Sequence, residues 1–281
     1  MLSYRHAFHA GNHADVLKHF VLFEVLRYFN RKDKPYWFVD THAGAGRYDL
    51  QGQAAAKNAE YAEGVARLWD RPGLPAPLAD FVTLLHRLNQ GGVLRRYPGS
   101  PSLAAALIRA QDRMRLFEMH PADVQVLGRL FRSTGRQVQV SEQDGFAALI
   151  GLLPPPTRRG VILIDPPYEV KTDYRRVEDT LGQALKRFAS GSYLVWYPLL
   201  RRREAQQLRE RLRRLPAPAW LQVELRVRAA AATPAGMFGS GMFVINPPWT
   251  LHATLDAVMP ALRDCLALGD GADFSLQAQL P

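Results

Sequence analysis

The chain has 281 residues, 47% of them hydrophobic, which is enough to bury the core of one large domain with or without an insertion. A single cysteine excludes an internal disulfide and a cysteine zinc cluster, and without an apolar leader or a run of roughly 18–20 apolar residues we expect a cytoplasmic protein with no membrane partner. The formal net charge of +10 favours a polyanionic partner such as nucleic acid, although GC-rich coding would also enrich arginine.

The predicted elements alternate between helices and strands. Helical patterns lie at 13–30, 101–111, 121–133, 144–152, 173–189 and 201–214. Strands are expected at 36–41, 114–119, 136–141, 160–165, 192–197, 220–228 and 241–246. This alternation predicts an α/β fold with a seven-stranded, mostly parallel sheet covered by helices on both faces. The last two strands have no helix between them, so we expect them to form an antiparallel pair at one edge.

One interval breaks the alternation. Residues 48–98 contain helical patterns at 58–69 and 78–88, separated by loops rich in glycine and proline. The connection is far longer than a βαβ crossover needs. We therefore predict an inserted, mostly helical subdomain at 48–98 and a main domain built from 1–47 and 99–281. An insertion beside a site is suited to grip a substrate or to act as a lid.

The first strand runs into a glycine-rich turn, Asp-Thr-His-Ala-Gly-Ala-Gly at 40–46, where the backbone can approach a ligand closely. The turn lacks the Lys-Ser/Thr of a Walker A loop, and the dinucleotide fingerprint is incomplete. An acidic residue follows each of the first four strands: Asp40, Glu118, Asp144 and Asp165. Each of these alone is more often a helix cap or a solvated acid. Together with seven strands they favour S-adenosylmethionine over NAD as the cofactor.

The stretch 160–168, Gly-Val-Ile-Leu-Ile-Asp-Pro-Pro-Tyr, is the most informative motif of the chain. It predicts a buried parallel strand with Asp165 just beyond its carboxyl end, where α/β sheets place their chemistry. Asp165 and the Pro166 carbonyl offer two acceptors to an exocyclic amine, and Tyr168 offers a stacking face. The motif resembles the Asp-Pro-Pro-Tyr signature of enzymes that methylate exocyclic amines of adenine or cytosine. The alternative is a strand end followed by a tight polar turn.

A second match to this loose signature is Asn-Pro-Pro-Trp at 246–249. Asp165 is favoured because its strand is expected beside the strand of the glycine turn. An asparagine also cannot accept a proton in the way a carboxylate does. We therefore expect Asn246 only to end an edge strand.

Four histidines fall within fourteen residues near the start of the chain: His6, His9, His13 and His19. Their spacings are not those of a zinc module, and we expect no metal. An arm that carries histidines and aromatic residues near a flipped base is a better use, and a strap packed over the domain is the alternative. Lys18 and His19 could face the carboxylate of the cofactor.

An arginine cluster lies on the helix predicted at 201–214. It could face phosphates or could be a solvated helix face, and both interpretations stay open. Its members are Arg201, Arg202, Arg203, Arg209, Arg211, Arg213 and Arg214.

Along its whole length the chain resembles the RlmJ family of 23S rRNA adenine-N6 methyltransferases. The blocks that carry the resemblance are 1–19, 40–48, 97–101, 158–168 and 241–249. The chain departs from the family in the loops at 51–57 and 70–77 and in the C-terminal thirty or so residues. The resemblance implies a Rossmann-like, class I S-adenosylmethionine-dependent methyltransferase with an inserted small helical subdomain.

The resemblance also implies a substrate, 23S rRNA, as naked RNA or as an early assembly intermediate, and we expect a monomer. It implies Asp165 as the catalytic acceptor and Tyr4 as a substrate contact. Cofactor contacts are implied at His19, His42, Ser100, Glu118, Asp144 and Gly145, with Lys18 nearby. From the residues themselves we add His6, Pro166 and Tyr168 on the substrate side and Gly44 and Asp165 on the cofactor side. Methylation of a DNA adenine or a small amine, and a non-catalytic RNA-binding assembly protein, remain alternatives.

Overall fold

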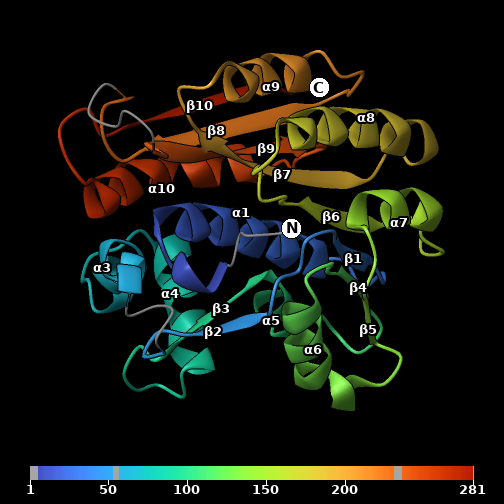
Figure 1. Cartoon of the computed structure of the whole chain (residues 1–281), viewed down its shortest axis with the longest axis horizontal. Coiled ribbons are helices and arrows are strands. Elements are labelled where there is room, and N and C mark those ends of the chain that lie inside the picture. Colours follow the sequence, from blue (N-terminus) through green and yellow to red (C-terminus); the bar gives the residue numbers. More distant parts are fainter. Residues whose placement is uncertain (1–5, 53–56, 231–235, 281) are drawn as a thin grey trace.

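A computed structural model describes residues 6–52, 57–230 and 236–280 of the chain. An eight-stranded sheet forms its centre, with helices on both faces (Figure 1). Tyr4, which we predicted as a substrate contact, lies outside the described residues.

The sheet has the order β10-β8-β9-β7-β6-β1-β4-β5. The strands are β1 (Trp37–Asp40), β4 (Arg113–Phe117), β5 (Val138–Ser141), β6 (Gly160–Ile164), β7 (Ser192–Leu199), β8 (Trp220–Arg226), β9 (Gly239–Ile245) and β10 (Asp273–Gln279). The five strands from β5 to β7 in this order are parallel, and β9 is antiparallel to both β7 and β8. The predicted α/β class is confirmed, and all seven predicted strands are present.

The predicted number of strands and the predicted edge of the sheet were both wrong. β10 is an eighth strand, antiparallel to β8, and it forms the edge of the sheet. All of its residues are exposed or partly buried, and it lacks a continuous apolar run, so the sequence pattern did not indicate it. The predicted antiparallel pair is therefore interior, and Asn246 follows a strand that lies between two others rather than an edge strand.

The helices match most of the predicted ranges. They are α1 (His13–Asn30), α5 (Ser100–Ala105), α6 (Pro121–Leu130), α7 (Gly145–Leu152), α8 (Lys171–Arg187), α9 (Arg203–Arg213) and α10 (Leu251–Leu266). Helix α1 has the predicted bounds, and the side chain of Asn12 caps it by accepting from the amides of Ala14 and Asp15. α5 is shorter than predicted, and α10 was not predicted.

Alternate side chains of the strands enter two separate hydrophobic clusters. On β6, Ile162 and Ile164 pack with α7, α8 and α9, whereas Val161 and Leu163 face the cluster that contains α1, α5 and α10. The two helix layers are visible on opposite sides of the sheet (Figure 1). Because both faces of β6 are covered, an unbroken apolar strand is stable there.

Residues 48–98 include β3 (Arg96–Pro98), η2 (Glu60–Glu63), α3 (Ala66–Trp69) and α4 (Ala76–Leu88), and β3 pairs with β2 (Arg47–Asp49). The helical pattern at 58–69 becomes two short pieces rather than one helix. Phe81 of α4 packs 5.9 Å from Phe20 and 5.6 Å from Phe23 of α1, between ring centroids. The segment thus shares a hydrophobic cluster with α1. Its separation as a subdomain stays a prediction.

Part of the arginine cluster is paired with polar side chains of β8 and α8. Arg209 on α9 pairs with Glu224 of β8 at 3.2 Å, and Arg213 donates to Gln222 at 2.6 Å. Arg211 pairs with Glu178 of α8 at 3.1 Å. These three side chains anchor α9, so neither prediction describes the whole cluster.

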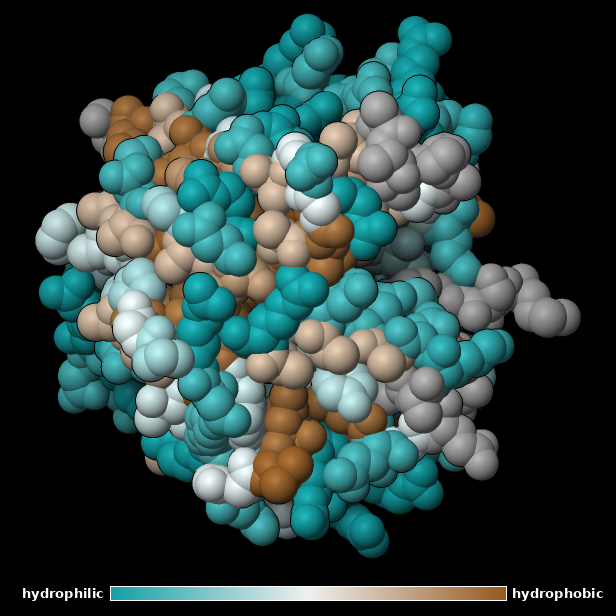
Figure 2. Space-filling model, turned by 90° about the vertical axis from the view of Figure 1, so that its left-hand side faces the viewer, coloured by the Kyte–Doolittle hydropathy of each residue, from teal (hydrophilic) through white to brown (hydrophobic). Residues whose placement is uncertain are grey.

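The surface of the face in Figure 2 is mostly hydrophilic, with hydrophobic atoms in small, separate groups. This face therefore presents no extended apolar area. None of the helices that the structure describes has the length and hydrophobicity to cross a membrane.

Candidate active site

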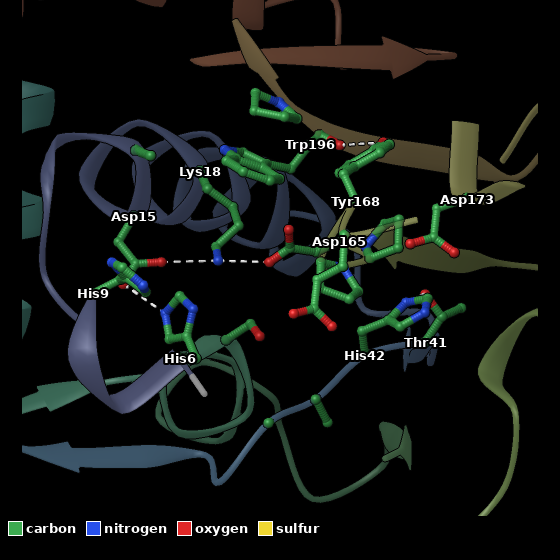
Figure 3. Close-up of a pocket in the computed structure, with 18 of the residues that line it drawn as sticks. His6, His9, Asp15, Lys18, Thr41, His42, Asp165, Tyr168, Asp173 and Trp196 are labelled. Carbon is green, nitrogen blue, oxygen red and sulfur yellow. Dashed lines mark hydrogen bonds and ion pairs between the residues drawn. The ribbon is translucent and has the colours of Figure 1, made fainter. Parts of the chain in front are cut away.

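A pocket of about 610 Å³ lies where the carboxyl ends of β1 and β6 meet (Figure 3). The chain proceeds from β1 to β4 and β5 on one side and returns to β6 and β7 on the other, which leaves a crevice at this switch point. Ten of the described residues that we predicted line the pocket: His6, Lys18, His19, His42, Gly44, Ser100, Glu118, Asp165, Pro166 and Tyr168.

A chain of charged side chains leads from the N-terminal arm to Asp165. Lys18 Nζ lies 2.6 Å from Asp165 Oδ2 and 2.8 Å from Asp15 Oδ1. Asp15 Oδ2 in turn lies 2.8 Å from His6 Nε2 and accepts from the amide of Gly11 at 2.9 Å. In Figure 3 Lys18 lies between the two carboxylates. Lys18 was predicted to contact the cofactor, but its ammonium group is held by protein carboxylates.

The charges in this chain stabilise one another. Burial lowers the pKa of Lys18, but the negative charges of Asp15 and Asp165 outweigh burial and hold that pKa well above its usual value. Burial alone would raise the pKa of Asp15, yet His6 and Lys18 hold it well below its usual range. The pair Asp15–Lys18 is therefore charged in the folded protein. Asp15 was missed at the sequence level, although its i, i+3 spacing to Lys18 on one helix is a signal for such a pair.

Glu118 is fixed by backbone amides rather than by a cation. Its Oε2 accepts from the amide of Gly44 at 2.8 Å, and its Oε1 accepts from the amide of His120 at 2.7 Å. Burial raises the pKa of Glu118, and these hydrogen bonds oppose the rise. The carboxylate is thus held rigidly beside the glycine turn, with lone pairs left to accept from hydroxyl groups of a ligand.

Asp40 and Ser100 form the floor beneath the turn. The Ser100 hydroxyl donates to Asp40 Oδ2 at 2.6 Å, and Asp40 is fully buried. Burial raises the pKa of Asp40 to about 7, with the hydrogen bond from Ser100 acting in the opposite direction. Ser100 lines the pocket, but its hydroxyl proton is already committed to Asp40.

Two histidines in the wall are neutral. Burial, with the charge of Lys18 as a further cause, lowers the pKa of His19 well below its usual value. The His19 ring bonds the Tyr97 hydroxyl through Nδ1 at 2.9 Å, and its buried Nε2 meets no partner among the described residues. Burial lowers the pKa of His42 to about 3. Both rings can therefore offer one donor or one acceptor to a ligand.

Asp144 and Gly145 do not line the pocket but support its wall. Asp144 caps α7 by accepting from the amide of Phe146 at 3.0 Å, and it also pairs with Arg176, which does line the pocket. A Cβ on Gly145 would lie 1.9 Å from the carbonyl oxygen of Thr41, so only glycine permits this approach of α7 to the turn.

Tyr168 and Trp196 are joined at the substrate side of the pocket. Tyr168 is only 3% exposed, has a φ of +51°, and donates its hydroxyl to the carbonyl of Trp196 at 2.8 Å. The Trp196 ring is partly exposed, lines the pocket, and lies 5.9 Å from Lys18 Nζ (Figure 3). Trp196 was missed at the sequence level. The register between β6 and β7 explains its position. Ile164 pairs with Val195, so Trp196 lies level with Asp165.

The rival loop at Asn246 lies at the opposite end of the sheet. β9 is antiparallel to β7, and Ile245 pairs with Tyr193 near the start of β7. The Asn246 amide donates to the carbonyls of Ala189 and Gly191, each at 2.7 Å. Its donors are thus used by the backbone, far from the crevice.

The model of a family described as ribosomal RNA large subunit methyltransferase D, RlmJ, matches residues 33–275. The chain belongs to this family. The RlmJ resemblance seen in the sequence is thereby confirmed.

Relatives of the RlmJ family are similar over nearly the whole chain. Two proteins named ribosomal RNA large subunit methyltransferase J, from Escherichia coli and Haemophilus influenzae, are 46% and 45% identical, each over 95% of this chain and 94% of the relative. A crystal structure of a Legionella pneumophila protein is 35% identical with a TM-score of 0.87, and the match covers 96% of this chain and 98% of that one.

Proposed function

We propose that this chain transfers a methyl group from S-adenosylmethionine to the N6 amine of an adenine in 23S rRNA. The observation that carries the proposal is the Asp165 carboxylate at the carboxyl end of β6, in the pocket and held by Lys18 at 2.6 Å. The names of the relatives, which are ribosomal RNA large subunit methyltransferases, support the substrate class.

The pocket fits the proposed cofactor. Glu118, fixed by two amides, would accept from ribose hydroxyls, and the unpartnered Nε2 of His19 would bond the carboxylate end. Gly44 has a φ of +59°, and a Cβ there would lie 2.3 Å from the Tyr48 hydroxyl, so the turn takes this shape most readily with glycine. When bound, S-adenosylmethionine supplies an electrophilic methyl group.

The chain's own residues would activate the amine. The N6 lone pair of adenine is delocalised into the ring, so the amine is a poor nucleophile. Lys18 occupies Asp165 Oδ2, and no hydrogen bond joins Oδ1 to another of the described residues. Oδ1 and the Pro166 carbonyl would accept the two N–H bonds, which favours a more tetrahedral and more nucleophilic nitrogen in the transition state. Asp165 would then receive the proton that leaves.

The target base would leave its stack to reach the pocket. Trp196 offers the more accessible aromatic face, whereas the ring of Tyr168 is almost fully buried. Arg176 and Arg202 also line the pocket and would meet the backbone phosphates beside the flipped base. A base that must be turned out favours protein-free RNA or an early assembly intermediate as the substrate.

The experiment is methyl transfer from labelled S-adenosylmethionine to protein-free 23S rRNA, with nucleoside analysis of the product. The wild-type protein is expected to form N6-methyladenosine, and Asp165→Ala to lose several orders of magnitude in rate while it still binds cofactor. Assembled large subunits and a matching DNA oligonucleotide are the comparison substrates. Cofactor binding without product on any RNA would refute the proposal and favour a non-catalytic assembly protein.

A further inference from the structure

Trp249 is the most exposed of the large hydrophobic side chains that the structure describes, at 71%. It ends the Asn-Pro-Pro-Trp loop after β9, at the end of the sheet opposite the pocket. The proposed reaction uses no part of this loop.

The loop that carries Trp249 is rigid. Asn246 has a φ of +51°, donates to the carbonyls of Ala189 and Gly191, and accepts from the Ser192 hydroxyl at 3.1 Å through its own carbonyl. Two prolines follow and fix two further φ angles. The backbone that carries the indole is therefore constrained before any ligand arrives, so little backbone entropy remains to be lost on binding.

The surroundings of Trp249 are basic. The Arg31 guanidinium, at the end of α1, lies 5.8 Å from the Trp249 ring and 5.8 Å from the Tyr28 ring. The last turn of α8, with two exposed cations, ends just before the carbonyls that hold Asn246. We call the exposed side chains Trp249, Arg31, Lys32, Lys34, Lys186 and Arg187 the basic edge. Asp33 is an acidic residue within the same segment, between Lys32 and Lys34.

We propose that the basic edge binds a second segment of the RNA substrate, with an unpaired base stacked on Trp249 and the backbone phosphates against Arg31 and its basic neighbours. This inference rests on the proposed function for the identity of the RNA. Stacking on an aromatic face accepts any base, and arginine adds charge and a planar contact. A single indole among cations suits a nucleic acid strand better than a membrane, which requires a wider apolar face.

Helix α1 sets the separation between the two RNA contacts. Lys18 touches Asp165 in the pocket, and Arg31 touches Trp249 at the basic edge. Arg31 lies thirteen positions after Lys18, which corresponds to roughly 20 Å along the helix axis. An RNA that contacts both places must therefore span at least roughly this distance from the target adenine.

The test is the kinetics and binding of Trp249→Ala in the full chain. With protein-free 23S rRNA we expect KM to rise about tenfold and kcat to stay within twofold, because stacking contributes binding rather than chemistry. Trp249→Phe should restore most of the loss. Val93→Ala, another exposed apolar side chain, is the matched control and should match the wild type.

A direct binding measurement separates this inference from the proposed function. Fluorescence polarisation of a labelled 20-nucleotide oligouridylate needs no turnover, and Trp249→Ala should weaken its binding about tenfold. Arg31→Ala should lower the salt dependence of log Kd by about one. If the wild type failed to methylate RNA but Trp249→Ala still weakened binding, the basic edge would stand without the enzyme assignment. Values of KM and Kd within twofold of wild type for Trp249→Ala would overturn the inference.

Discussion

Two loops of this molecule carry nearly the same four residues, Asp-Pro-Pro-Tyr at 165–168 and Asn-Pro-Pro-Trp at 246–249, and in each one non-glycine residue has a φ of +51°. In the first loop the acidic side chain enters a pocket and the aromatic ring is buried. In the second loop the amide side chain bonds the backbone and the aromatic ring is exposed. The two loops therefore expose opposite ends of the same motif.

Strand direction explains the difference. β6 is parallel to its neighbours and delivers its loop to the crevice, whereas β9 is antiparallel to β7 and delivers its loop to the other end of the sheet. A four-residue signature therefore does not by itself identify a catalytic loop, and the direction of the preceding strand decides whether the loop reaches the crevice. The backbones also differ, because the positive φ is at Tyr168 in the first loop and at Asn246 in the second.

The largest effect is expected when the first loop is given the sequence of the second at one position. Asp165→Asn keeps the shape but removes the proton acceptor and the charge that pairs with Lys18. We expect the single-turnover rate of methyl transfer to fall about 10²–10⁴-fold. Calorimetric titration with S-adenosylmethionine is the control for an intact pocket. A rate within tenfold of the wild type would show that the carboxylate is not what distinguishes the loops.

Removing the cation behind the first loop tests its electrostatics. Lys18→Met leaves the buried carboxylate of Asp15 without its ammonium partner, so we expect the free energy of unfolding to fall by about 3–5 kcal/mol. Urea unfolding measures this. Asp15→Asn in the Lys18→Met background is the matched control and should recover part of the loss. An unfolding free energy unchanged by Lys18→Met would contradict the charged pair described here.

The free energy of unfolding should also depend on pH through His13, at the start of α1. Burial, the largest cause, lowers the pKa of His13 to about 4. The unfolded chain then binds a proton that the folded chain does not between about pH 6.5 and 4, so stability present above pH 6.5 is lost as the pH falls. The contribution is about 3 kcal/mol. Urea unfolding at several pH values should show a shallower decline for His13→Gln, and parallel curves would argue against this assignment.

The smallest effect is expected in the second loop. Asn246→Ala removes two hydrogen bonds of 2.7 Å and places alanine at a positive φ, so we expect a loss of about 1–2 kcal/mol of stability. The rate of methyl transfer per folded molecule should not change. Asn246→Gly is the control that keeps the positive φ accessible and isolates the hydrogen bonds. A fall in rate comparable to that of Asp165→Asn would mean that the two loops had been assigned the wrong way round.

Sequence patterns predicted the parallel core well. β6 is an apolar run because both of its faces are buried, and α1 begins at a residue with a capping side chain before it. These signals are local, so they can be read without a partner. The position of Asp165 followed from the same signals, since its place depends only on where β6 ends.

The remaining features depend on contacts between distant segments. The ion pair between Lys18 and Asp165 joins residues 147 positions apart, and no local sequence pattern near either residue predicts it. The accessible face of Trp196 depends on its register with β6, and the inward turn of Arg209 depends on a glutamate in β8. Long-range pairings of this kind were beyond periodicity and motif arguments, which is why the ion pair between Lys18 and Asp165 was not predicted.

The strand β10 has a consequence for handling the protein. It covers β8, whose residues 221–225 are all buried, with a strand whose own outer positions are polar and exposed. Without β10 the sheet would end in the seven-residue strand β8 with its outer amides and carbonyls unpaired, which is a template for pairing with other chains. A chain shortened before residue 273 should therefore aggregate on expression although every residue proposed for catalysis is still present.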